Sequence, residues 1–119
     1  MTDDPGQHAK AVEFFRGRSA ESPAYVSLLV FVETCWVMKS HYRITNRKIS
    51  LLFSGLMDSR EIVFEDPDFI ASIFSANGFE KLDISDYVIA AIATKAGCLK
   101  TVTFDNAAAR RVPGMELLA

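Results

Sequence analysis

Residues 85–105, SDYVIAAIATKAGCLKTVTFD, constrain the fold of this chain more than any other stretch. They predict a helix, a glycine break, a short apolar strand and then an aspartate. On a helix, Asp86 shares an apolar face with Ile89, Ala90 and Ala93. Asp105 ends the predicted strand at 99–104, and ligands of open α/β sheets bind beyond the carboxyl ends of the strands. The stretch therefore predicts one carboxylate on a partly buried helix and a second at a strand end.

The rest of the sequence alternates predicted helices with predicted strands. Helices are expected at 5–16, 28–39, 45–59, 67–77, 85–96 and 106–111, and strands at 24–27, 61–64, 99–104 and 115–118. Asp4 and Thr45 are predicted helix N-caps. This order indicates an α/β fold with a short parallel sheet covered on both faces. A βαβ domain usually begins with a strand, whereas this sequence begins with a helix.

The composition predicts one soluble, cytoplasmic domain over residues 1–119. Half of the residues are hydrophobic, and the net charge of −2 neither favours nor excludes nucleic acid. The start MTDDPGQHAK is too polar for a signal peptide, and no apolar run approaches the ~20 residues of a membrane helix. Cys35 and Cys98 are expected to be reduced, since no CxxC motif is present.

Glu33 is the one acidic residue in the apolar stretch LLVFVETCWVMK. Burying an unpaired carboxylate costs several kcal/mol, so such a group is neutral, paired or bound to a metal. A pairing with a buried arginine and an exposed position on the helix are the alternatives.

Glu33, Asp86 and Asp105 would repel one another in one pocket unless a cation lay between them. Hard cations such as Mg²⁺ or Mn²⁺ take carboxylate oxygens, and they activate water against a phosphodiester. His8 and His41 have polar neighbours and are expected at the surface. A receiver-type phosphoacceptor would need an acid pair near a first strand and a late lysine, which are not found.

The segments FVETCWVMK, SDYVIAAIATKAGC and TVTFDNAAARRVPGMELL, in this order and spacing, resemble PIN-domain proteins of the VapC-like toxin group. The resemblance covers the whole chain. It implies a three-layer α/β/α sandwich and a metal-dependent ribonuclease of the toxin–antitoxin type. It also implies RNA as substrate and an antitoxin protein as partner.

Matched motif by motif, the resemblance assigns metal binding and catalysis to Glu33, Asp86 and Asp105, with Mg²⁺ or Mn²⁺ as cofactor. Thr103 and Ser27 match supporting hydroxyl positions. Asp83 is either an accessory acid or the N-cap of the following helix.

One family element has no counterpart here, namely an opening apolar strand that ends in an aspartate. We expect this chain to lack one of four carboxylates and a central strand, through a start placed too late or a real truncation. The resulting gap predicts a homo-oligomer such as a dimer. The alternative function is a catalytically crippled PIN-like module that acts only in RNA or protein binding.

Arg110 and Arg111 follow Asp105 closely and are the predicted phosphate contacts. A second basic group lies between the predicted second and third helices: Lys39, His41, Arg43, Arg47 and Lys48. For both groups an ordinary solvated helix face is the alternative.

Overall fold

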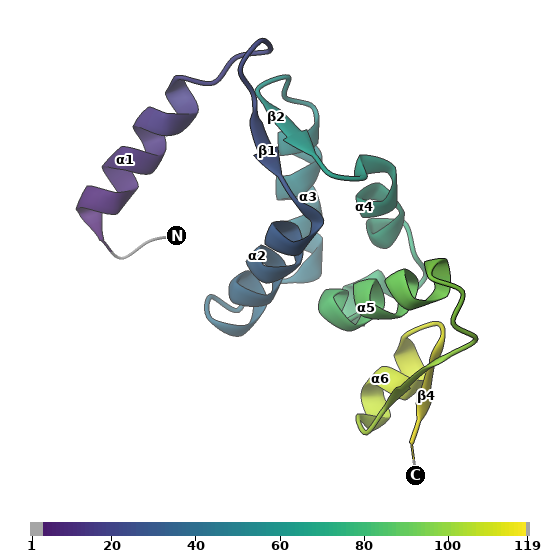
Figure 1. The fold of residues 1–119 in the computed structure, drawn as a ribbon. Coiled ribbons are helices and arrows are strands. Elements are labelled where there is room, and N and C mark those ends of the chain that lie inside the picture. Colours follow the sequence, from purple (N-terminus) through teal and green to yellow (C-terminus); the bar gives the residue numbers. More distant parts are fainter. Residues whose placement is uncertain (1–3, 119) are drawn as a thin grey trace.

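The computed structural model describes residues 4–118, as six α-helices, one 3₁₀ turn and four short strands (Figure 1). The elements in chain order are α1 (Pro5–Arg16), β1 (Ala24–Val26), α2 (Leu28–Ser40), α3 (Asn46–Met57), β2 (Ile62–Phe64), α4 (Pro67–Phe74), η1 (Phe79–Lys81), α5 (Ile84–Lys95), β3 (Thr101–Thr103), α6 (Asn106–Arg111) and β4 (Met115–Leu117). The predicted order of helices and strands is confirmed.

Local chemistry explains where several helices begin. Asp4 accepts hydrogen bonds from the backbone N–H groups of Gly6 and Gln7, and Pro5 occupies the first turn of α1. Thr45 caps α3 through the N–H of Lys48. These caps satisfy N–H groups that have no partner within the helix, so both predicted N-caps are confirmed.

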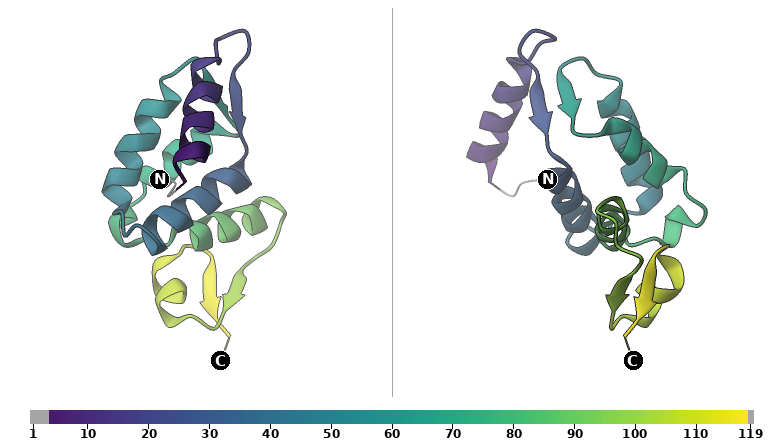
Figure 2. Two further views of the ribbon diagram at one scale, coloured as in Figure 1. Left: turned by 90° about the vertical axis from the view of Figure 1, so that its left-hand side faces the viewer. Right: turned by 45° about the vertical axis from the view of Figure 1, so that its right-hand side comes forward.

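The strands pair in parallel, as predicted, but they form two sheets and not one. β1 pairs with β2, placing Tyr25 opposite Val63, and β3 pairs with β4, placing Val102 opposite Glu116. The two sheets lie towards opposite ends of the molecule, with α2 and α5 packed against each other between them (Figure 2). The described residues thus hold two short parallel sheets, β1–β2 and β3–β4, within the predicted α/β fold.

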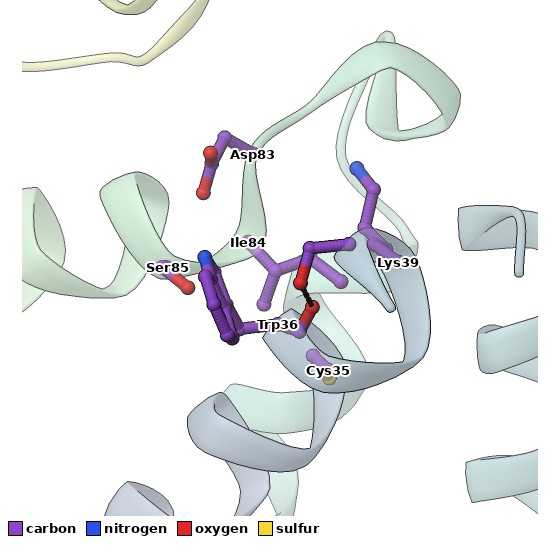
Figure 3. Close-up of a pocket in the computed structure, with 7 residues that line it drawn as sticks. Cys35, Trp36, Lys39, Asp83, Ile84 and Ser85 are labelled. Atoms are coloured by element: carbon purple, nitrogen blue, oxygen red, sulfur yellow. Dashed lines mark hydrogen bonds between the residues drawn. The ribbon is translucent and has the colours of Figure 1, made fainter. Parts of the chain in front are cut away.

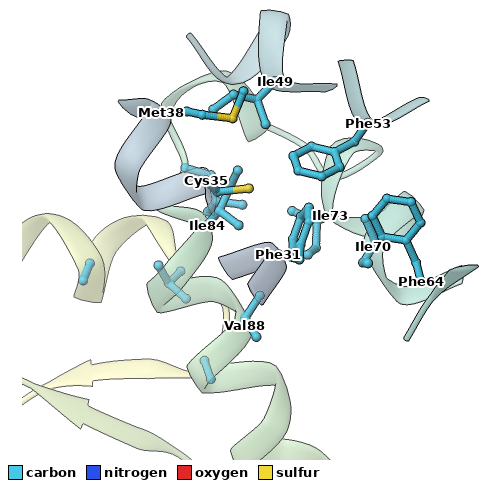
Figure 4. Packing of buried hydrophobic residues seen from close by; sticks show 14 residues of the cluster. Phe31, Cys35, Met38, Ile49, Phe53, Phe64, Ile70, Ile73, Ile84 and Val88 are labelled. Carbon is cyan, nitrogen blue, oxygen red and sulfur yellow. The ribbon is translucent and has the colours of Figure 1, made fainter. Parts of the chain in front are cut away.

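The hydrophobic core lies mainly among α2, α3, α4, β2 and the start of α5 (Figure 4). Phe31 of α2 is fully buried, and its ring meets that of Phe53 edge to face, with centroids 4.8 Å apart. Phe53 in turn meets Phe64 of β2 at 5.9 Å. This aromatic chain fixes α2 against α3 and β2, and thereby sets the position from which α2 meets α5.

The molecule is extended for its size. Its radius of gyration is 16.1 Å, against about 13.5 Å for a compact chain of this length. Its accessible surface is 8304 Å², against roughly 6,400 Å² for a compact protein of this mass. The α1 helix buries no residue, and Figure 1 shows it standing apart from the other helices. Much apolar surface is therefore left uncovered.

No helix in residues 4–118 is both long and apolar enough to cross a bilayer.

Candidate active site

Three aspartates line one pocket of about 250 Å³ at the end of the molecule that holds the β3–β4 sheet. Asp83 and Asp86 come from the start of α5, and Asp105 comes from the start of α6. Three cations line the same pocket: Lys39, Lys81 and Arg111. We call this depression the carboxylate pocket.

Helix capping holds two of these acids. Asp83 accepts a hydrogen bond from the N–H of Asp86 at 3.1 Å and caps α5. Asp105 accepts from the N–H groups of Ala107 and Ala108 and caps α6. Each cap uses the Oδ1 atom, so the same local chemistry that starts the helices directs both carboxylates to the pocket. The capping role of Asp83, which was one of two alternatives, is confirmed.

Asp86 lies in the first turn of α5 and is half-buried. Its pKa is raised above the ordinary value, first by burial and then by the neighbouring charges of Asp83 and Asp105. The effect of Asp105 on this pKa shows that the starts of α5 and α6 lie near each other, although Asp86 and Asp105 are 19 positions apart in the sequence. A bound cation would relieve this repulsion.

Side chains of α2 and α3 hold the segment before α5, residues 79–82, by hydrogen bonds to its backbone. The side-chain amide of buried Asn46 donates to the carbonyl of Leu82 at 2.7 Å and to that of Phe79. Lys39 Nζ donates to the same Leu82 carbonyl at 3.1 Å. These bonds tie the turn that carries Lys81 and Asp83 to α2 and α3, so that both side chains reach the pocket.

Glu33 is in a different place. It is exposed on α2 and lines a neighbouring depression with Val32, Trp36, Val37 and Ser85. This matches the alternative of an exposed helix position, because the described residues leave this side of α2 uncovered. Within residues 4–118, no group of three or more His, Cys, Asp or Glu side chains is close enough to hold a metal ion.

The predicted supporting residues have local partners. Ser27 caps α2 by accepting from the N–H of Val30, and Thr103 Oγ1 accepts from the N–H of Asp105. Thr103 therefore helps to set the direction of the chain at Asp105. Their roles in catalysis stay predictions.

Of the predicted phosphate contacts, Arg111 lines the carboxylate pocket, while Arg110 is exposed on the same short helix. Lys81 was missed by sequence reasoning, because only the 3₁₀ turn η1 brings it to the acids. Among the described residues, no ion pair joins these cations to the three aspartates. The positive charge is thus available to an anionic ligand.

The two cysteines and the two histidines take no part in the pocket. Burial raises the pKa of the Cys35 thiol to about 12, so it is protonated and unreactive at neutral pH. Cys98 is a free, exposed thiol, and His8 and His41 are exposed as predicted.

The donor set suits a hard divalent cation, because the pocket offers carboxylate oxygens that repel one another. Mg²⁺ is commonly held by one or two carboxylates, with water and substrate phosphate completing its shell. Asp86 and Asp105 meet that requirement, with Glu33 as the predicted further ligand.

A sequence model of the PIN domain matches residues 1–114. No curated protein and no solved structure is similar enough to match the sequence. Since the match spans nearly the whole chain and the fold is of the α/β type with short parallel sheets, the chain belongs to the PIN domain family, whose members are in general nucleases.

Proposed function

We propose that this protein is a metal-dependent endoribonuclease and that the carboxylate pocket is its active site. The observation that carries the proposal is the meeting of Asp83, Asp86 and Asp105 from two helices in one pocket.

In this proposal Asp86 and Asp105 hold Mg²⁺ or Mn²⁺, while Glu33, the further ligand that the sequence predicts, lines the neighbouring depression and would have to approach from there. The ion would supply an activated water and neutralise negative charge on the phosphodiester. Arg111 and Lys81 bind the phosphates on either side, and they offset the negative charge that would otherwise repel RNA. Thr103 holds the backbone of Asp105 in place through its hydroxyl.

We further propose that the ribonuclease is a toxin that a cognate antitoxin protein silences. A large apolar groove of about 570 Å³ supports a protein partner. Its lining comes from five elements or their flanks, including Phe15, Val30, Leu52, Leu56 and Ile62. Exposed apolar patches of this kind mark interaction sites on soluble proteins. A second copy of the chain is the other candidate to cover this face, in keeping with the predicted dimer.

The excess surface is large enough for such a partner. The chain exposes roughly 1,900 Å² more than a compact protein of its mass, and stable interfaces bury about 1,200–2,000 Å² in total. Binding there would cover exposed apolar side chains of the groove such as Val30 and Leu52, which are 51% and 46% exposed.

A second candidate function is a PIN-like module that binds RNA or protein without cleaving it. The observation that favours it is the position of Glu33, which lines a depression apart from the aspartates.

The test is cleavage of single-stranded RNA by the purified protein with Mg²⁺ or Mn²⁺, compared with EDTA. We expect metal-dependent cleavage that Asp86→Asn and Asp105→Asn each abolish, together with loss of growth arrest on expression. Asparagine can still cap α6 at position 105, so that variant removes charge while keeping the fold. Asp58→Asn, at the exposed end of α3, is the matched control and should cleave normally. Retained cleavage in both active-site variants would reject the assignment, and no cleavage by the unaltered protein would favour the binding module.

A further inference from the structure

Three depressions adjoin along α2 and the start of α5 because they share lining residues. Trp36 and Ser85 line both the Glu33 depression and the next one, shown in Figure 3. Lys39 and Asp83 line both that second depression and the carboxylate pocket. We call this row of three adjoining depressions, from Glu33 to Arg111, the α2–α5 groove.

Trp36 is the most prominent apolar side chain in this groove. It is 60% exposed, although tryptophan is usually well buried, and it is the single tryptophan of the chain. Its neighbour Cys35 is 1% exposed, and Ile84, which lines the same pocket, is 2% exposed. The indole therefore projects from a rigid, well-packed part of the molecule, which suits it to present a flat apolar face to a ligand.

Three cations line the groove among the four carboxylates of Glu33, Asp83, Asp86 and Asp105. Lys39 lies one turn after Trp36 on α2. Like Asp83, it lines both the depression of Figure 3 and the carboxylate pocket. Lys81 and Arg111 follow in the carboxylate pocket. An aromatic face followed by cations is the arrangement by which proteins hold single-stranded nucleic acid, since bases stack and phosphates pair with Lys or Arg.

We propose that Trp36 is a stacking platform for an unpaired base of single-stranded RNA, with Lys39 holding the phosphate between that base and the carboxylate pocket. The inference rests on the proposed ribonuclease function and names the form of RNA that the site accepts. Bases in a duplex are already stacked on their neighbours and cannot reach the indole, so the groove selects unpaired segments. Trp36 positions the substrate and takes no part in the bond-breaking step.

The test measures binding in EDTA, where no cleavage is needed. Because Trp36 is the only tryptophan, its fluorescence reports directly on the groove. An unstructured oligoribonucleotide should quench the emission. An abasic strand of equal phosphate number should leave it nearly unchanged and bind about tenfold more weakly.

Variants separate stacking from general apolar packing. Trp36→Phe should keep most of the affinity for labelled RNA, whereas Trp36→Leu should lower it about tenfold. Lys39→Ala should weaken binding to all sequences and reduce the salt dependence by about one phosphate contact. Tyr25→Leu is the matched control, because Tyr25 is 64% exposed on β1, outside the groove, and should bind normally.

Equal affinity of Trp36→Leu and the unaltered protein, or equal quenching by the abasic strand, would overturn the proposal. The proposal would also be overturned if the Trp36→Leu variant kept its affinity for RNA but no longer bound a protein partner. Failure of the ribonuclease assignment would appear separately, as cleavage that survives Asp86→Asn while the fluorescence result stands.

Discussion

The two sheets have the same number of strands and the same parallel pairing, yet they differ in how they are packed. In the β1–β2 sheet, Ala24 and Phe64 are buried, and Phe64 joins the aromatic core. The β3–β4 sheet has no buried residue in its strands, and Val102 and Leu117 are exposed. The sheet next to Asp105 is thus supported mainly by the short helix α6, through Ala108 and Val112.

This difference indicates that the carboxylate pocket joins a well-packed part of the molecule to a weakly packed one. Asp83 and Asp86 lie at the start of α5, where Ile84 is part of the core, whereas Asp105 follows the weakly packed strand β3. Regions with few buried apolar contacts open at lower free energy than the core. A cation bound by both sides would therefore hold the β3–α6–β4 segment against α5.

The largest expected effect on stability is in the core. Phe31→Ala should lower the free energy of unfolding by about 3–5 kcal/mol, because Phe31 is fully buried and contacts Phe53. Phe104→Ala, at the end of β3, should change it by less than about 0.5 kcal/mol, because Phe104 is 80% exposed. Urea unfolding measures both, and similar losses would show that the two ends are packed alike.

A smaller effect is expected from the pH dependence of Asp86. Its pKa is raised in the folded state, so the folded state holds the proton more tightly, and stability falls as pH rises from the ordinary value of 3.8 through the raised one. The Asp86→Asn substitution removes this pH-dependent loss of stability. In EDTA, the variant should gain about a few tenths of a kcal/mol relative to the unaltered protein between acidic and neutral pH, since solvent screens a half-buried group. A relative loss over this range would contradict the repulsion among the three aspartates.

The sequence predicted the local features of this molecule well. Helix order and the caps at Asp4, Thr45 and Asp83 were accessible because a cap depends on residues within one turn. The strand predicted at 99–104 is confined to Thr101–Thr103, because Leu99 is fully exposed and Phe104 nearly so, leaving no packing to extend it.

Features that depend on tertiary packing were not accessible from sequence. The division into two sheets, the exposure of Glu33 and the arrival of Lys81 at the acids all follow from how α2, α5 and η1 meet. The exposure of Trp36 belongs to the same class, because an apolar helix pattern predicts a buried tryptophan.

The most direct test of the central claim is titration of the protein with Mn²⁺, followed by the electron paramagnetic resonance signal of the free ion. We predict saturable binding by the unaltered protein that Asp86→Asn and Asp105→Asn each remove, with Asp58→Asn binding normally. Mn²⁺ binding that survives both active-site substitutions, or that is absent from the unaltered protein, would contradict a metal site shared by α5 and α6.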